Sequence, residues 1–265
     1  MAKALALINV GEAYTKFWND HCAGAVRAYA ARHGYAVVVF DRPLDPSDGR
    51  PPQWQKLLIL EQPELRGFDD VVWLDSDILI NFHRAPCIVT ANGSDKVGAI
   101  SFKRSEMGSP AKLDNRWGRR STGGIRDWYR SHGFGDDVDD FTNTGVMVLK
   151  PRLHAAIFRW VYDNCEERPD SHQENGALSY HLFRNDLINV IDERFNVSWN
   201  GEVMEKYRFL LNDRYWNDAV IASLCVNAAW ENAWFLHFLN SKWRRDIRLV
   251  AQDSADVSRL QIVVT

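Results

Sequence analysis

Short apolar runs alternate with helical patterns along the first third of the chain. Ala4 to Val10, Tyr35 to Phe40 and Val71 to Leu74 are brief aliphatic runs of the kind found in buried strands. Between them, Thr15 to Arg32 and Trp54 to Gln62 carry apolar residues at helical spacing. The order strand, helix, strand, helix, strand predicts an α/β fold with a parallel, doubly wound sheet.

The same signals continue through the rest of the chain, less regularly. Val97 to Phe102, Thr144 to Leu149 and Ala233 to Phe238 predict further strands, and Leu153 to Glu167 and Glu174 to Phe183 predict helices. We therefore expect helices to flank one mostly parallel central sheet.

A polar segment, Lys103 to Phe141, lies between two of these predicted strands. It is rich in glycine and charge. A stretch of this length without a strong periodic pattern predicts a long functional loop or insertion.

Composition narrows the class of protein. A net charge of −3 in 265 residues gives no positive field for nucleic acid. The apolar runs are shorter than the roughly 20 residues of a spanning helix. Met1 to Val10 lacks the regions of a signal peptide, and the scattered cysteines form no C-x-x-C pair. We expect a soluble, cytoplasmic protein. The charged segment Lys242 to Arg248 is typical of a solvated face, with peripheral contact to a membrane as the alternative.

The strongest chemical signal is an acidic pair, Asp75-Ser76-Asp77, directly after the third apolar run. Ligands of parallel α/β sheets bind beyond the carboxyl ends of the strands. Two carboxylates this close repel each other unless a cation or water separates them. Carboxylate oxygens select hard ions such as Mg²⁺ or Mn²⁺, which bridge the phosphates of a nucleotide diphosphate. A solvated acidic turn is the plain alternative for this pair.

Other polar residues follow predicted strands or begin predicted helices. His237 ends a late apolar run and would complete a metal shell, and Lys242 would neutralise a phosphate. Tyr14 offers a face for a nucleobase. Asn143-Thr144-Gly145 suits a sugar ring, and Gln173-Glu174-Asn175 suits a helix-terminus site. The alternative for His237 and Tyr14 is packing in the core, and for Lys242 it is a solvated surface lysine. For Asn143-Thr144-Gly145 it is an ordinary turn, and for Gln173-Glu174-Asn175 a simple helix cap.

Taken in order, these motifs resemble GT-A-fold retaining glycosyltransferases. The families concerned are family 8, of the glycogenin and lipopolysaccharide galactosyltransferase type, and family 34, the α-galactosyl and α-xylosyl transferases. The motifs that carry the resemblance are Asn9-Val-Gly-Glu-Ala-Tyr14, Tyr29-Ala-Ala-Arg-His-Gly34-Tyr35, Trp54-Gln-Lys56 with Trp73-Leu-Asp75-Ser-Asp77, Asn143-Thr-Gly-Val-Met-Val-Leu, and His237-Phe-Leu-Asn240-Ser-Lys242-Trp243.

The resemblance implies a role for each matched residue. Asp75, Asp77 and His237 would hold Mn²⁺ or Mg²⁺. The catalytic residues implied are Asp75, Asp77, Glu174 and Gln173. The residues implied to contact the nucleotide sugar are Asn9, Val10, Tyr14, Lys56, Ser76, Asn143, Thr144, Gly145, Asn175 and Lys242.

Three departures from the family pattern stand out. Asn240 occupies the place of a family glycine, and Lys242 comes one residue early. The family's Asp-Gln pair corresponds to Glu174-Asn175, or to Gln173 in a shifted register. The segment Lys103 to Phe141 matches no family motif.

The expected activity is metal-dependent, retaining transfer of a hexose or pentose from a UDP-linked or similar nucleotide-diphosphate sugar to a saccharide or other hydroxyl acceptor. The expected organisation is a single GT-A-like domain over residues 1–265. It would consist of a nucleotide-binding half (1–102), an insertion (103–142), a donor-sugar and acceptor half (143–245) and a peripheral tail (246–265).

Two alternatives belong to other classes. In a haloacid-dehalogenase-type phosphatase, Asp75 would be the nucleophile, and Gly135-Asp136 to Asp140 would stand for the metal motif. However, two predicted strands precede Asp75, whereas that family's nucleophile strand normally comes first. A non-catalytic carbohydrate-binding protein would use the eleven Trp residues, although most Trp fills cores.

Overall fold

The computed structural model describes residues 1–47, 49–102, 124–166, 173–239, 241–252 and 263–264. Its largest sheet has seven strands in the order β10-β2-β1-β3-β6-β5-β7. The strands are β1 (Lys3–Ile8), β2 (Tyr35–Phe40), β3 (Asp70–Leu74), β5 (Val97–Ala99), β6 (Val146–Leu149), β7 (Ile188–Val190) and β10 (Val263–Val264). All pairings in it are parallel except those of β6, which runs antiparallel to β3 and β5. The mostly parallel sheet expected from the sequence is confirmed.

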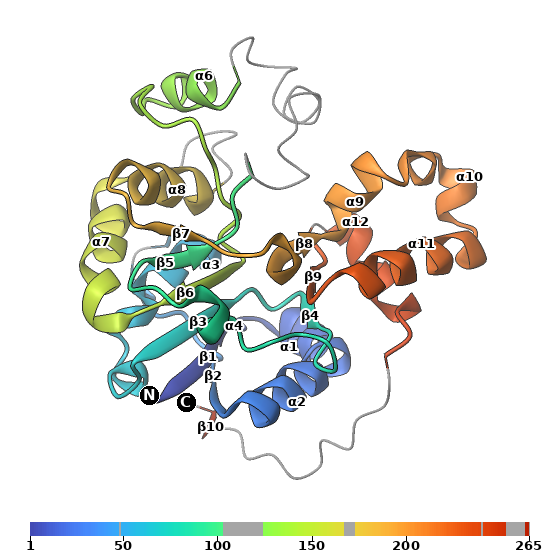
Figure 1. Ribbon diagram of the computed structural model, residues 1–265, viewed down its shortest axis with the longest axis horizontal. Coiled ribbons are helices and arrows are strands. Elements are labelled where there is room, and N and C mark those ends of the chain that lie inside the picture. Colours follow the sequence, from blue (N-terminus) through green and yellow to red (C-terminus); the bar gives the residue numbers. More distant parts are fainter. Residues whose placement is uncertain (48, 103–123, 167–172, 240, 253–262, 265) are drawn as a thin grey trace.

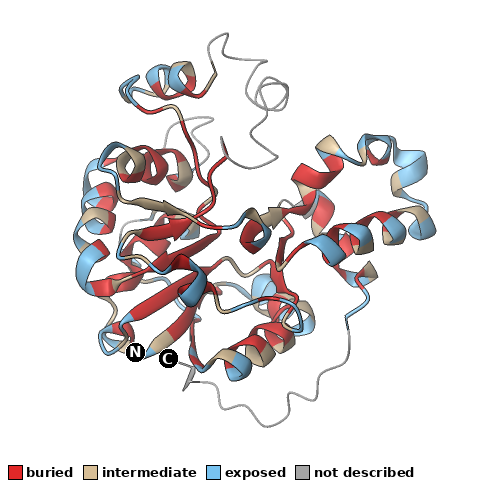
Figure 2. Cartoon of the chain, in the orientation of Figure 1, coloured by how far each residue is buried: buried red, intermediate tan, exposed pale blue. Residues whose placement is uncertain are grey.

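Alternate residues of the central strands enter two different cores. Leu5 and Leu7 of β1 pack in one cluster, whereas Ala4 and Ala6 pack in the other. The same alternation occurs in β2, β3 and β6, because successive side chains of a strand point to opposite faces. Both faces are therefore covered, and the sheet is the most deeply buried part of the molecule (Figure 2).

Helices form a layer on each side of this sheet (Figure 1). One side holds α1 (Glu12–His21) and α2 (Ala23–His33), where the sequence predicts one continuous helix. Gly34 ends α2 with φ 70°, a left-handed conformation that glycine adopts without strain. The other side holds α3 (Pro52–Gln55), the 3₁₀ helix η1 (Lys56–Glu61), α7 (Pro151–Asn164) and α8 (Glu174–Arg184). Shorter elements are η2 (Pro63–Leu65), α4 (Ile88–Asn92) and α6 (Gly124–Ser131).

A second, small sheet continues the chain beyond Asp77. Its order is β4-β9-β8, formed by β4 (Ile78–Ile80), β9 (Phe235–His237) and β8 (Val197–Ser198). Ile78 pairs with His237 in the antiparallel β4–β9 ladder. The 3₁₀ helix η4 (Glu193–Asn196) leads directly into β8. This sheet brings three distant segments of the chain to the end of β3.

A group of helices projects from the rest of the molecule beside this small sheet (Figure 1). This helical lobe comprises α9 (Trp199–Glu205), η5 (Arg208–Leu211), α10 (Asp213–Trp216) and α11 (Ala219–Asn232), with α12 (Ser241–Arg244) and η6 (Arg245–Leu249) beneath it. The sequence analysis predicts none of these helices. Their start signals are present, since Ser198, Asn212 and Asp218 cap α9, α10 and α11 with their side chains.

Two expected segments lie partly outside the described residues, namely 103–123 of the insertion and 253–262 of the tail. The described part of the insertion contains α6. Within the described chain, the structure has no helix with the length and apolar character needed to cross a membrane.

Candidate active site

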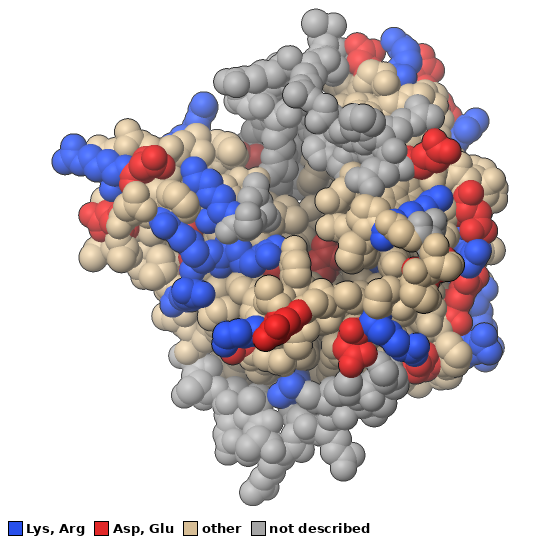
Figure 3. All heavy atoms as spheres, turned by 180° about the vertical axis from the view of Figure 1, so that it is seen from behind, with Lys and Arg blue, Asp and Glu red and all other residues tan. Residues whose placement is uncertain are grey.

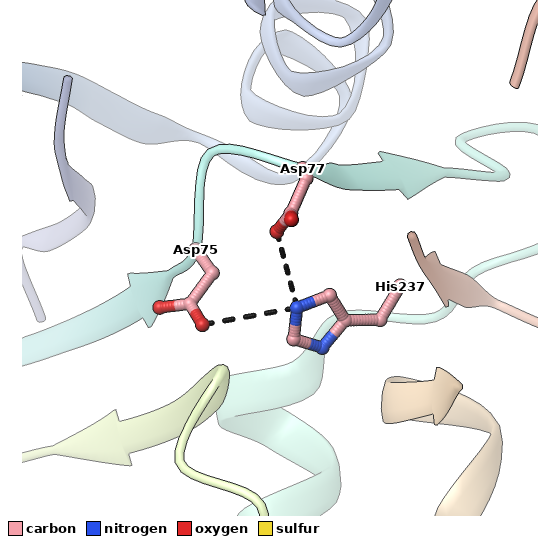
Figure 4. Close-up of side chains that lie close together, drawn as sticks. All are labelled: Asp75, Asp77 and His237. Carbon is pink, nitrogen blue, oxygen red and sulfur yellow. Dashed lines mark ion pairs between the residues drawn. The ribbon is translucent and has the colours of Figure 1, made fainter. Parts of the chain in front are cut away.

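Asp75 and Asp77 lie on the turn between β3 and β4, at the carboxyl end of the central sheet. The Asp75 backbone amide donates to the Gly145 carbonyl at 2.8 Å, which holds the turn against the start of β6. Asp75, Asp77 and His237 point toward one another (Figure 4). Each offers one ligand atom, and these atoms all lie within 4.8 Å of one another.

Hydrogen bonds around His237 fix which ring nitrogen faces the two aspartates. The Asn196 amide group donates to the Asn143 carbonyl at 3.1 Å, so its oxygen is left for His237 Nδ1 at 3.0 Å. An amide oxygen only accepts, so Nδ1 carries the hydrogen. In the neutral ring, Nε2 then presents a lone pair toward Asp77 Oδ1 at 3.1 Å and Asp75 Oδ2 at 3.7 Å.

This arrangement fits a divalent cation. Nε2 is buried and has no hydrogen-bond partner among the described residues, although two carboxylates lie close to it. Lone pairs of one nitrogen and two carboxylates repel one another unless a positive charge lies between them. Nitrogen and carboxylate oxygens are a usual ligand set for Mn²⁺. The amide of Asn196 behind the ring is the kind of outer partner that orients a metal-binding histidine.

Gly145 makes room for the imidazole of His237. A Cβ atom at position 145 would lie 2.3 Å from His237 Cε1 and 2.8 Å from Nδ1. The sequence analysis assigns this glycine to the approach of a sugar. In the structure, the absent side chain lets a histidine ring pack against the backbone.

A second charged cluster lies behind Asp75. The Lys56 ammonium is buried and contacts Glu174 Oε1 at 2.8 Å and Asp75 Oδ1 at 3.1 Å. Thr144 Oγ1 also donates to Glu174 Oε1 at 2.9 Å. Burial opposes a charge on Lys56, yet the two carboxylates raise the pKa of its ammonium above the ordinary value. Burial likewise raises the pKa of Glu174, with Lys56 opposing it.

Arg244, which the sequence analysis does not single out, reaches the acidic pair. Its Nη2 donates to Asp77 Oδ2 at 2.9 Å, and its guanidinium lies 5.0 Å from the ring centroid of Tyr14. Burial alone would raise the pKa of the Asp77 carboxyl, but positive charge beside it, from His237 in its protonated form and from Arg244, holds the pKa below its usual range. Lys242 instead lies over Trp216, with Nζ 4.5 Å from the ring centroid.

A cavity of about 880 Å³ opens over both clusters. Residues singled out by the sequence analysis that line it are Val10, Tyr14, Lys56, Asp75, Ser76, Asp77, Asn143, Gln173, Asn175 and His237. Lining residues that it missed are Ile8, Pro52, Gln53, Trp73, Phe102, Phe141, Asn200, Leu239 and Arg244.

Three other singled-out residues, Asn9, Thr144 and Glu174, lie behind this lining. Asn9 is buried at the end of β1, where its amide donates to the Phe40 carbonyl at 2.7 Å. Thr144 and Glu174 are buried in the Lys56 cluster. Gln173 and Asn175, the neighbours of Glu174 in the chain, line the cavity, whereas Glu174 does not.

Gln173 has an unusual backbone conformation. With φ 59° and ψ −135° it precedes the first residue of α8, and a non-glycine residue in that region is strained. It lines the cavity. Strained residues often occur at functional sites, so the conformation supports a role for Gln173 there.

The residues named for a phosphatase do not converge on this cavity. Asp136 pairs with Arg130 at 2.8 Å, and Asp140 accepts from Ser101 at 2.6 Å. Neither belongs to the described lining. Within the part of the chain that the structure describes, the acidic residues that line the cavity are Asp75 and Asp77.

Comparison by sequence identifies no relative, since no family model and no curated protein matches the chain. Comparison by structure does. A glycosyltransferase involved in glycosylation of the major capsid of PBCV-1 superposes with a TM-score of 0.54 at 15% identity, covering 93% of this chain and 98% of that one. The bifunctional glycosyltransferase WbbM superposes with a TM-score of 0.55 at 12% identity, covering 93% of this chain and 49% of that one.

Identities this low establish the fold alone. Both matched proteins are glycosyltransferases, and the present chain spans about half the length of WbbM. The mostly parallel sheet, with acidic residues at the end of β3, agrees with the architecture expected from the sequence motifs. The chain has the GT-A fold found in glycosyltransferases of known structure.

Proposed function

We propose that this protein transfers a sugar from a nucleotide-diphosphate donor to a hydroxyl group of a saccharide or similar acceptor, with retention at the anomeric carbon. A divalent cation, Mn²⁺ or Mg²⁺, would be held by Asp75, Asp77 and His237. The observation that carries the proposal is the buried Nε2 atom of His237, 3.1 Å from Asp77 Oδ1 and 3.7 Å from Asp75 Oδ2, beneath a cavity of about 880 Å³.

Each charged residue has a separate part in this proposal. A bound cation would offset negative charge on the departing diphosphate. Arg244 would donate to a phosphate oxygen, because its guanidinium already lies beside Asp77 on the cavity wall. Lys56 would hold Asp75 in place and keep a positive charge beneath the phosphates. Lys242 stays a prediction from the motif, and its side chain lies over Trp216.

The remaining cavity residues would bind the two ends of the donor. Tyr14 is 45% exposed on the cavity wall, so one ring face is available for a nucleobase such as uracil. Asn143, Gln173 and Asn175 present polar groups suited to sugar hydroxyls. Glu174 is fully buried, and we propose that it acts through Lys56 and Thr144 rather than by touching the sugar.

A donor screen tests the proposal. Hydrolysis of UDP- and GDP-sugars would be measured with Mn²⁺, with Mg²⁺ and with EDTA. We expect one UDP-sugar to be hydrolysed in the presence of metal, and Asp75→Ala and Asp77→Ala to abolish turnover while the protein keeps its circular dichroism. Near-normal turnover of either variant at saturating donor would reject the assignment.

Two further measurements separate the alternatives. Hydrolysis of a simple aryl phosphate without nucleotide sugar would favour the phosphatase. A carbohydrate-binding module would show no thermal stabilisation by UDP with Mn²⁺, whereas binding of both to the folded state raises the melting temperature. The anomeric configuration of the product, followed by NMR, tests retention.

A further inference from the structure

The helical lobe exposes an unusual amount of large apolar surface. Ten large apolar side chains are exposed in the described chain, and six of them lie between residues 204 and 224. They are Met204, Phe209, Leu211, Tyr215, Val220 and Leu224. They lie on α9, η5, α10 and α11. Exposed apolar residues gathered in one part of a fold indicate an interaction site, whereas isolated ones do not.

The outward face of α11 is apolar along most of its length. Val220 and Leu224 are each 69% exposed, and Ala228 follows one turn later on the same face. The opposite face, which includes Val226 and Trp230, is buried. A helix that borders water normally places polar residues on its outer face. Here the outer face has apolar residues until Glu231.

Basic side chains are the majority of the exposed charged residues on this lobe. Between residues 199 and 249, the exposed charged residues of the described chain comprise six basic and three acidic ones. The basic ones are Lys206, Arg208, Arg214, Lys242, Arg245 and Arg248. Lys and Arg side chains gather over this lobe, on the left of the view in Figure 3. The three exposed acidic residues are Asp213, Asp218 and Glu231, so basic side chains outnumber acidic ones two to one on the exposed surface of the lobe.

Aromatic rings hold two of these cations in place. The Arg245 guanidinium lies 3.4 Å from the ring centroid of Trp216 and donates to the Trp216 carbonyl at 2.8 Å. Lys242 Nζ lies 4.5 Å from the centroid of the same ring. Aliphatic, aromatic and basic side chains together are the composition of surfaces that lie in the interface of a bilayer.

We propose that the helical lobe docks on a membrane surface rich in anionic lipids. Its apolar residues, centred on Val220 and Leu224, would enter the headgroup region, and the exposed Arg and Lys residues of the lobe would contact lipid phosphates. A second copy of the chain fits less well, because a two-fold interface would bring the same basic residues against each other. This inference does not depend on the proposed activity.

The position of the lobe would place the cavity near the bilayer. Arg244 lines the cavity, and the next residue, Arg245, is one of the exposed basic residues of the lobe. Only one peptide bond separates a residue of the cavity wall from a residue of the docking surface. Docking would therefore hold the cavity within reach of an acceptor that is itself anchored in lipid.

Co-sedimentation with vesicles tests the proposal. The protein would be mixed with vesicles of phosphatidylcholine alone or of phosphatidylcholine with phosphatidylglycerol, across a range of salt concentrations. We expect binding to the anionic vesicles only, weakening as salt rises. Val220→Glu with Leu224→Glu should reduce it at least about tenfold, given the burial energy of two aliphatic side chains. Arg208→Gln with Arg214→Gln should reduce it by roughly fivefold per residue.

The control helix is α7, which has the same length as α11 and also exposes a leucine. Leu153 is 56% exposed there, so Leu153→Glu should leave vesicle binding unchanged, as should Arg152→Glu. If thermal melting shows that the double glutamate variant is destabilised, the double variant Val220→Ser with Leu224→Ser is used instead. Equal binding of wild type and lobe variants would overturn the proposal. The proposal would also be overturned if the protein formed dimers through this face in analytical ultracentrifugation and did not bind the vesicles.

Discussion

Two charged clusters meet at Asp75, and they differ in how the negative charge of their carboxylates is offset. In the cluster behind Asp75, the buried Lys56 ammonium contacts two carboxylates, and Thr144 adds a hydrogen bond to Glu174. In the cluster in front of it, Asp77 and Asp75 face Nε2 of His237. The rear cluster contains its own cation. The front one has Arg244 on a single oxygen of Asp77, and His237 Nε2 has no hydrogen-bond partner among the described residues.

The difference separates a structural cluster from a binding site. A buried ion pair holds the fold in one arrangement, and removing one partner leaves an uncompensated charge. Carboxylates and a nitrogen lone pair brought this close repel one another unless a cation or water lies between them. Mutations in the rear cluster should therefore affect folding with or without metal. Mutations in the front cluster should affect metal binding and leave folding in EDTA largely unchanged.

The largest effect is expected for Asp77→Asn. It removes the charge of one metal ligand, so Mn²⁺ affinity should fall by more than about 100-fold. Mutation of residues that only hydrogen-bond to a metal ligand costs less, about 10–100-fold. Isothermal titration with Mn²⁺ measures the affinity, and urea unfolding in EDTA measures folding. The exposed Asp95→Asn is the control. An unchanged Mn²⁺ affinity would show that the front cluster is not a metal site.

Lys56→Met should act on folding instead. It leaves Glu174 buried without its cation, which costs about 3–5 kcal/mol when one member of a buried pair is removed. Urea unfolding in EDTA checks this. The double variant Lys56→Met with Glu174→Gln should recover most of the loss, because both charges are then gone. If the single variant unfolds like the wild type, the rear cluster does not hold the fold.

Gly145→Ala tests the space beside His237 without touching a charge. The new Cβ would lie 2.3 Å from His237 Cε1, so the ring must move and Mn²⁺ affinity should fall by about 10–100-fold. Gly67→Ala is a matched control, since a Cβ there meets nothing within 4 Å. Equal metal affinity of the two variants would contradict the assigned position of the ring.

The smallest effect distinguishes two candidate phosphate ligands. Arg244→Gln should raise the KM for the nucleotide sugar about tenfold, the worth of one charge-assisted hydrogen bond. Lys242→Gln should change it less than about twofold, because Lys242 lies over Trp216. Steady-state kinetics with varied donor gives both values. If Lys242→Gln raised the KM more than Arg244→Gln, the phosphate contact would be assigned to Lys242, as the motif predicts.

The sequence by itself determined the local features of this protein. The aliphatic runs of β1, β2 and β3 and the stop at Gly34 depend on residues a few positions apart, so periodicity and backbone preference predict them. Asp75 and Asp77 belong to the same category, because the end of a strand places both residues of the pair. The expectation that these aspartates lie close to His237 came from the order of the motifs, which resembles that of a known family.

Only the tertiary structure decided which distant groups meet. The reversed direction of β6 and the β4–β9 ladder, which sets Ile78 opposite His237, depend on pairing between segments far apart in the chain. Arg244, rather than Lys242, reaches Asp77 because α12 turns one side chain toward the cavity and another toward Trp216. Hydrophobic periodicity contains no information on such pairings, because each strand or helix would satisfy its own pattern beside several different neighbours.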